Sequence, residues 1–294
     1  MKLTDIRLEN VSYIYSPNTP FQKEALENIN ITFKGGKLTG IIGHTGSGKS
    51  TLAQLLNGLL KPTSGKVYLG DTDIWEKPKE INKIRYKVGL VFQYPEYQLF
   101  EETVYEDIAY GPKNMGVSGD NLNRTVSEAA DFVGLTPDLL KKSPFELSGG
   151  EKRRVALAGV IAMEPEVLVL DEPAAGLDPR GRTEILERIR NYQKQKNNTI
   201  ILISHSMEDI SEYADEIAVL KNSKVLCSGT VDTVFRNAEL IRSNGLAIPK
   251  ITEIMLELKH RGFPVSDGIY TTSDAHKEII RLINSYKKNG ENNA

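Results

Sequence analysis

The sequence has one cysteine, one tryptophan and no long apolar run among its 294 residues. A single cysteine, Cys227, excludes an intramolecular disulfide and is typical of a reducing compartment. Every apolar run is shorter than the roughly 18–20 residues that a membrane-spanning helix needs. The first residues lack the apolar segment of a signal peptide. We therefore expect a soluble chain that reaches a membrane only through a partner.

A strong charge of either sign is also lacking. Lys and Arg number 37 and Asp and Glu 39, for a net charge of −2. This balance gives no general electrostatic reason to bind nucleic acid. The length is enough to bury a full core and leaves room for a second, smaller domain.

The most informative stretch is a glycine-rich segment between an apolar run and a helical pattern. Leu38–Ile42 is predicted to be a buried strand and Leu52–Leu56 a helix. The residues between them fit the phosphate-binding pattern G-x-x-x-x-G-K-S/T, and the strand–turn–helix context supports that interpretation. The predicted nucleotide-binding residues are Gly43, His44, Thr45, Gly46, Ser47, Gly48, Lys49, Ser50 and Thr51.

Each part of this loop has a chemical task. Glycines lack Cβ atoms, so backbone N–H groups can surround a phosphate. The N-terminus of the following helix attracts the same anion. Lys49 would reach the β- and γ-phosphates, and the Ser50 hydroxyl would bind Mg²⁺. The alternative is a glycine-rich turn that binds nothing, which the Lys-Ser pair and the correct flanks argue against.

An acidic pair follows another apolar strand. Glu166–Leu170 is predicted to lie in a parallel sheet, and Asp171 and Glu172 come next. Ligands bind at this edge of α/β sheets. Asp171 would hold Mg²⁺ directly or through water, and Glu172 would accept a proton from the attacking water. Alone, the pair could equally be a simple turn.

Two further polar residues end apolar strands. His205 follows the predicted strand Thr199–Ile203, and Gln93 follows Val88–Phe92. We expect His205 to hydrogen-bond the γ-phosphate or the attacking water. The neutral amide of Gln93 could contact both Mg²⁺ and water, and the loop after it could report the γ-phosphate to a neighbouring protein.

A second anion site is predicted at another helix start. Ser148 and Glu151 have the spacing of a capping box, with Gly149 and Gly150 between them. The hydroxyl, the N–H groups and the helix dipole would attract an anion together. The pattern leaves open whether this site serves the ATP of its own chain or that of a second chain across a dimer.

The whole pattern predicts an α/β protein. Residues 3–15 are expected to form an edge strand, and residues 95–165 an inserted helical lobe. Residues 1–240 form one predicted domain and residues 241–294 a small helical extension, with a composition change near 244–249. In that extension the apolar residues Ile251, Ile254, Met255 and Leu258 have the spacing of one face of a helix.

These motifs together resemble the nucleotide-binding subunit of ABC transporters over about residues 3–235. The matching segments are Walker A at Gly43–Thr51, the Q-loop at Gln93, the signature motif at Leu147–Glu151, Walker B at Leu168–Glu172, the D-loop at Ala175–Asp178 and the switch histidine at His205. Glu151 stands where the family often has Gln. Tyr15 matches the aromatic residue that stacks on adenine, and Tyr13 is its competitor.

The resemblance implies a P-loop NTPase fold of the ABC type. Such a fold has a mostly parallel core sheet, an N-terminal antiparallel β subdomain and an inserted helical subdomain. The implied cofactors are ATP and Mg²⁺, with Mg²⁺ held by Ser50, Gln93 and Asp171. The family pattern also implies a head-to-tail dimer, in which Ser148–Glu151 of one protomer caps the ATP held by Lys49 of the other.

A finer resemblance is to the energy-coupling factor (ECF) transporter ATPases, EcfA, also called the CbiO type. It is carried by Val91–Phe100, Ala109–Asn114, Arg153–Val160 and Met163–Pro165. It implies ATP hydrolysis that powers uptake of vitamins or transition-metal ions, by a peripheral protein at the cytoplasmic face of the cell membrane. The implied partners are a second EcfA-type ATPase, an EcfT-like transmembrane scaffold and a substrate-binding membrane S-component, with no nucleic acid.

Two details of this resemblance concern contacts. It implies that helices of the EcfT-like scaffold enter the groove after Gln93. The extension at residues 241–294 looks like the one by which ECF ATPases touch each other. The alternatives are a soluble ABC ATPase acting on nucleic acid or ribosomes, and a binding module without turnover. The first usually has a second ATPase core, a coiled-coil insert or a basic linker, and the second conflicts with the intact Glu172 and His205.

Overall fold

A six-stranded sheet forms the centre of the molecule. The computed structural model describes the backbone of residues 3–291 and the side chains of residues 3–285. The strand order is β10-β9-β3-β8-β7-β6, and neighbours are parallel except for the β9–β10 hairpin. This confirms the predicted core sheet. Its strands are β3 (Leu38–Gly43), β6 (Val88–Val91), β7 (Val167–Asp171), β8 (Thr199–Ile203), β9 (Glu216–Lys221) and β10 (Lys224–Thr230).

A smaller antiparallel sheet faces it, with the order β2-β1-β4-β5. Its strands are β1 (Ile6–Tyr15), β2 (Lys23–Phe33), β4 (Ser64–Leu69) and β5 (Thr72–Asp73). The prediction of an edge strand at residues 3–15 is wrong, because β1 pairs with both β2 and β4. The register shifts after Leu8, where Asn10 has a positive φ of 51°. This bulge interrupts the alternation of apolar and polar residues along β1. The sequence pattern of this central strand therefore resembles that of an edge strand.

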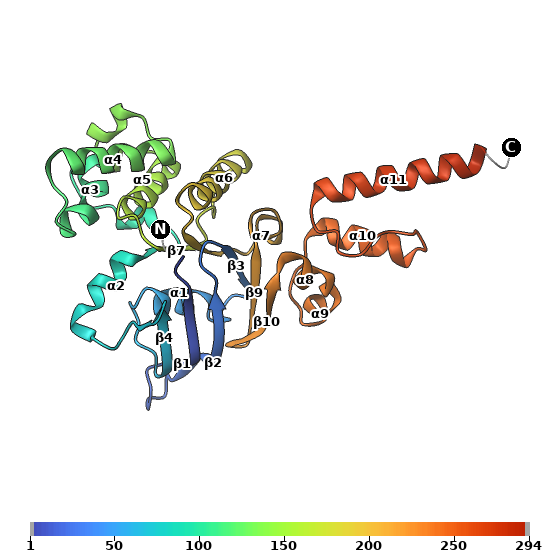
Figure 1. Cartoon of the computed structure of the whole chain (residues 1–294), viewed down its shortest axis with the longest axis horizontal. Helices are drawn as coiled ribbons and strands as arrows, with labels where there is room; N and C mark the ends of the chain where they lie inside the picture. The colour runs from blue at the N-terminus through green and yellow to red at the C-terminus, as the bar shows by residue number, and fades with distance from the viewer. Residues whose placement is uncertain (1–2, 292–294) are drawn as a thin grey trace.

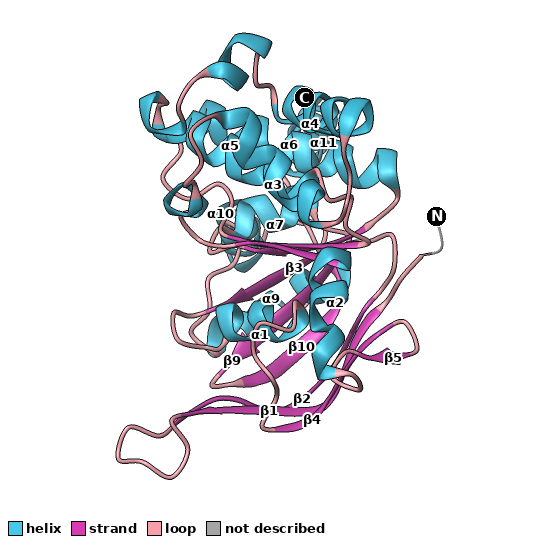
Figure 2. Cartoon of the chain, turned by 90° about the vertical axis from the view of Figure 1, so that its left-hand side faces the viewer, coloured by secondary structure: helices cyan, strands magenta, loops and turns pink. Residues whose placement is uncertain are grey.

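Helix α1 (Lys49–Leu56) lies between the two sheets (Figure 2). Its Leu52, Leu55 and Leu56 are fully buried among side chains of both sheets, so the helix start is held rigidly beside β3. The opposite face of the core sheet is covered by a second core, to which α5 (Gly149–Ile161), α6 (Pro179–Lys196), α7 (Met207–Tyr213) and α8 (Val231–Arg236) contribute.

The predicted helical lobe is present beyond one edge of the core sheet (Figure 1). The short α2 (Ile81–Lys87) precedes β6. Helices α3 (Val104–Asn114) and α4 (Gly119–Val133) pack on each other and on α5. A 3-10 helix at Pro137–Lys141 follows α4.

The C-terminal helices extend away from this body (Figure 1). The main core runs through α9 (Ala238–Ser243) to Leu246 and Ile248. A separate small core then joins α10 (Lys250–His260) to α11 (Thr272–Glu291). The predicted apolar period on α10 is only partly buried, since Met255 is 3% exposed but Ile254 51%. Among the described residues, no helix is long and apolar enough to cross a bilayer.

Candidate nucleotide-binding site

The glycine-rich loop joins β3 to α1 in a conformation that requires glycine. Gly48 has φ of 103°, and a Cβ atom there would lie 2.4 Å from the Ala25 carbonyl oxygen. Ser47 N–H donates to the His44 carbonyl at 3.1 Å, which closes the turn. Any side chain at position 48 would therefore push β2 away from the loop.

Lys49 lies inside the curve of this loop. Its Nζ donates to the carbonyl oxygens of Gly43 at 2.8 Å and His44 at 3.0 Å, and the residue is 7% exposed. Burial lowers the pKa of Lys49, and the nearby Glu172 and Asp171 oppose that effect. A buried cation held only by carbonyl oxygens is well suited to exchange them for phosphate oxygens.

Asp171 ends β7 beside the start of α1. Burial raises the pKa of Asp171, and the neighbouring Ser50 hydroxyl opposes that effect. The hydroxyl of Ser50, the Asp171 carboxylate and the Gln93 amide are hard oxygen donors, which fit Mg²⁺. No cluster of three or more acidic, His or Cys side chains suited to a metal occurs in the described part of the chain. Any cation here would therefore need nucleotide oxygens or water to complete its shell.

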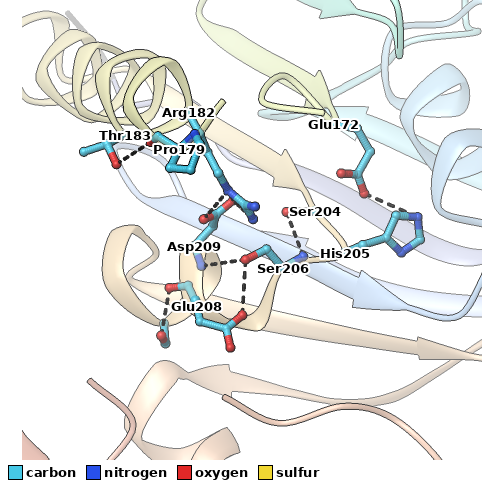
Figure 3. Close-up of polar contacts among 10 residues, drawn as sticks. Glu172, Pro179, Arg182, Thr183, Ser204, His205, Ser206, Glu208 and Asp209 are labelled. Carbon is cyan, nitrogen blue, oxygen red and sulfur yellow. Dashed lines mark hydrogen bonds and ion pairs between the residues drawn. The ribbon is translucent and has the colours of Figure 1, made fainter. Parts of the chain in front are cut away.

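Glu172 has an unusual backbone and an unusual pKa. Its φ is 54°, and its N–H donates to the Ile203 carbonyl at 3.0 Å, which ties it to β8. Burial, aided by the neighbouring Asp171 charge, raises the pKa of Glu172 to about 7. Its Oε1 lies 3.4 Å from His205 Nε2 (Figure 3), and burial lowers the pKa of His205. A carboxylate that titrates near neutral pH is suited to proton transfer.

The raised pKa of Glu172 predicts a pH-dependent loss of stability. A carboxyl with a higher pKa in the folded state stabilises the fold at low pH, and this is lost as pH rises through about 7. We compare the free energy of unfolding of Glu172→Gln with that of the parent, both without nucleotide. The difference in favour of Glu172→Gln should grow by roughly 3 kcal/mol as the pH rises from about 4 to about 9. Urea unfolding at several pH values measures this. A difference that stays constant with pH would contradict it.

Predicted residues from four separate strands and from the loop line one cleft of about 230 Å³, but Gly43, His44 and Ser47 of the loop are not among the described residues that line it. Tyr15, at the end of β1, borders it and its hydroxyl lies 3.2 Å from Thr51 Oγ1. Tyr13 instead packs on the core beneath, edge-to-face with Tyr15 at 4.8 Å. The lining residues are Tyr15, Lys23, Ala25, Thr45, Gly46, Gly48, Lys49, Ser50, Thr51, Gln93, Asp171, Glu172 and His205.

The second predicted anion site lies elsewhere. Ser148 and Glu151 form the predicted capping box at the start of α5, with Ser148 N–H donating to Glu151 Oε2 at 2.9 Å. Neither these residues nor Gly149 and Gly150 are among the described residues that line the cleft. Asp178 is also outside the lining, and it caps α6 by accepting from Gly181 N–H at 2.6 Å.

The structure adds ion pairs that the sequence did not predict. Arg153, only 7% exposed at its side chain, contacts both carboxylate oxygens of Glu96 at 3.1–3.3 Å, and also donates to the Ala175 carbonyl. This links the segment after Gln93 to α5 and to the loop before α6. The partners are 57 positions apart along the chain, so no local pattern indicated them.

The fold and the cleft define an ATP-binding cassette ATPase. Residues 26–175 match the family described as "ABC transporter". The EcfA2 ATP-binding protein of the energy-coupling factor transporter from Clostridium acetobutylicum is 55% identical over 96% of this chain and 99% of its own. The Clostridium tetani EcfA2 is 50% identical over 97% and 99%. The chain belongs to this family of ECF transporter ATP-binding proteins.

Solved structures agree with this family. The cbiO1 protein of Clostridium perfringens, described as part of the ABC transporter complex cbiONQ, has a TM-score of 0.72 and 40% identity, covering 85% of this chain and 98% of that one. A dimeric ATP-binding cassette, MJ0796 with ADP and Pi, has a TM-score of 0.70 and 27% identity, covering 76% and 98%. The chain is therefore an ATPase subunit whose ATP hydrolysis is coupled to transport.

Proposed function

We propose that this chain uses Mg²⁺ and ATP to power the uptake of vitamins or transition-metal ions, as a peripheral subunit at the cytoplasmic face of the cell membrane. One observation carries the site assignment: a single cleft holds a phosphate-binding loop, a buried lysine, two carboxylates and a histidine. The full-length similarity to EcfA2 proteins supports the transport role.

The predicted catalytic and binding residues of the cleft have proposed roles. Lys49 and the loop N–H groups hold the phosphates, with Mg²⁺ held by Ser50, Asp171 and Gln93. Bound Mg²⁺ would neutralise phosphate charge. Glu172 takes the proton from the attacking water, which its pKa near 7 permits. His205, within 3.4 Å of Glu172, orients that water or the γ-phosphate.

A second EcfA-type ATPase completes the site. Ser148–Glu151 and Asp178 are absent from the described lining of their own cleft, although they form a helix start and a capped loop. We propose that both segments approach the nucleotide of the partner chain in a head-to-tail dimer. The extension at residues 241–294 would add a second contact between the two ATPases, and exposed Ile254, Ile280 and Ile283 offer an apolar surface for it.

An EcfT-like scaffold is proposed to dock after Gln93. Four aromatic side chains are exposed there, and Phe100 and Tyr110 form an edge-to-face pair at 5.0 Å. An aromatic group of this kind suits apolar helices of a membrane protein. The substrate-binding S-component would then be reached through the scaffold. The aromatic residues are Tyr94, Tyr97, Phe100 and Tyr110.

Purification from native membranes tests the transport role. The tagged full chain, solubilised in mild detergent, should carry a second ATPase and integral membrane proteins. Tyr97→Ala should lose the membrane proteins but keep ATP affinity. The control is Phe21→Ala, on the β1–β2 loop, because Tyr97 and Phe21 are each 85% exposed. Recovery with ribosomes or nucleic acid and without membrane proteins would overturn the transport role.

Tyr15 is predicted to stack on the adenine base. Tyr15→Ala should weaken ATP binding by about 5- to 150-fold, since aromatic–base stacking contributes roughly 1–3 kcal/mol. Tyr15→Phe should bind ATP nearly as the parent does. Fluorescent-nucleotide titration measures both. A larger loss in Tyr13→Ala than in Tyr15→Ala would assign the stacking role to Tyr13 instead.

A further inference from the structure

An ion pair outside the cleft joins α6 to α7, the helices that follow the loops carrying Asp178 and His205. Arg182, in the first turn of α6, binds the carboxylate of Asp209, in the first turn of α7 (Figure 3). Arg182 Nε lies 2.9 Å from Oδ1 and 3.0 Å from Oδ2 of Asp209, and Nη2 lies 2.8 Å from Oδ2. The Asp209 side chain is 11% exposed. Such a two-pronged pair fixes orientation as well as distance.

The backbone N–H of Asp209, beside its ion-paired carboxylate, connects the start of α7 to the loop that carries His205. Asp209 N–H donates to Ser206 Oγ at 3.1 Å, and Ser206 N–H donates to Ser204 Oγ at 3.1 Å. Hydrogen bonds therefore fix the residues on both sides of His205. The His205 side chain itself is 52% exposed and meets Glu172 at 3.4 Å. Its position in the cleft thus depends on the backbone that Asp209 and Ser206 hold.

The backbone N–H of Arg182 likewise connects the start of α6 to the loop that carries Asp178. The Arg182 N–H donates to the Asp178 carbonyl at 2.9 Å, and the Asp178 carboxylate caps the helix through Gly181. The two ends of the ion pair therefore lie one helical turn from Asp178 and one from His205. Figure 3 shows Arg182 and Asp209 side by side, with His205 beyond Ser206.

We propose that Arg182 and Asp209 are positioning residues for ATP hydrolysis. Neither is among the described residues that line the cleft, and together they hold the His205 loop at a fixed place relative to the Asp178 loop. This inference rests on the proposed role of His205. It predicts that loss of the pair slows the chemical step and leaves ATP binding intact, because in the described part of the chain the two side chains bond to each other and not to the phosphate-binding loop between β3 and α1.

Kinetics on the full chain, with its copurified subunits, test the inference. Arg182→Gln and Asp209→Asn should each lower kcat about 10-fold or more, with KM for ATP changed less than about 2-fold. Arg182→Lys keeps the charge without the two-pronged geometry and should recover part of kcat. Arg236→Gln, which breaks the exposed Arg236–Asp232 pair on α8, is the matched control and should leave both constants unchanged.

Combined variants separate positioning from general damage. If the pair acts through His205, adding His205→Ala to Arg182→Gln should lower kcat little beyond His205→Ala alone. Full additivity of the two losses, or a kcat of Arg182→Gln and Asp209→Asn equal to the parent, would overturn the inference. His205→Ala with normal kcat would instead overturn the proposed role of His205. If Arg182→Gln does not fold, the conservative Arg182→Lys gives the same comparison.

Discussion

Lys49→Ala should lower ATP affinity by roughly 100-fold or more. Each hydrogen bond to a charged group contributes about 1.5–3 kcal/mol, and Lys49 is placed to make at least two to the phosphates. Its Nζ already occupies the curve of the loop, where it contacts the carbonyl oxygens of Gly43 and His44. The substitution also removes a positive charge that interacts with Asp171 and Glu172, and the two uncompensated carboxylates would repel the nucleotide further.

Titration with a fluorescent ATP analogue measures this loss. Lys61→Ala is the control, because Lys61 follows α1 on the sequence but lies over the Trp75 ring, away from the cleft lining. Circular dichroism shows whether the variant folds. Affinity of Lys49→Ala within a few-fold of the parent would remove the glycine-rich loop from its proposed place at the centre of ATP binding.

The parts of the site that the sequence predicted well are those encoded locally. The loop at Gly43–Thr51 is flanked directly by β3 and α1, so one short stretch contains the strand, the glycines and the helix start. Asp171, Glu172, Gln93 and His205 follow apolar runs, and parallel strands deliver their ends to one edge of the sheet. Parallel topology therefore turns separate local patterns into one cleft.

The parts that were missed depend on contacts between distant segments. Arg182 and Asp209 are 27 positions apart, and Arg153 and Glu96 are 57 apart. Neither pair has a periodic signal, because each joins the starts of separate elements. The edge assignment of β1 failed for a related reason. Its partner β4 comes after the phosphate-binding loop in the sequence, so the pairing is long-range. The bulge at Asn10 also interrupts the apolar alternation by which a central strand could have been recognised.

The unpredicted contacts also explain how the cleft tolerates unfavourable groups. Lys49, Asp171 and Glu172 are all less than 9% exposed. Burial lowers the pKa of Lys49 and raises the pKa of Asp171 and of Glu172, so it favours the neutral form of each group. Glu172 in addition has a left-handed backbone. Buried charge and strain of this kind persist only where the surrounding fold imposes them. The strands and ion pairs around the cleft supply that rigidity, and ATP with its cation would relieve the charge.

Glu172→Gln should lower ATP hydrolysis by about 100- to 10,000-fold, the usual range for loss of a general base. ATP binding should remain near that of the parent, since the amide keeps the size of the carboxyl and removes one negative charge from the phosphate site. Single-turnover kinetics measure the rate of hydrolysis, and nucleotide titration measures ATP affinity, for Glu172→Gln and the parent. Asp209→Asn should lower hydrolysis less than Glu172→Gln does, because it leaves the base in place and removes only a neighbouring charge that helps to raise the pKa of Glu172. If Glu172→Gln hydrolysed ATP at nearly the parent rate, water would be activated by another group, and His205, 3.4 Å away, would be the first to test.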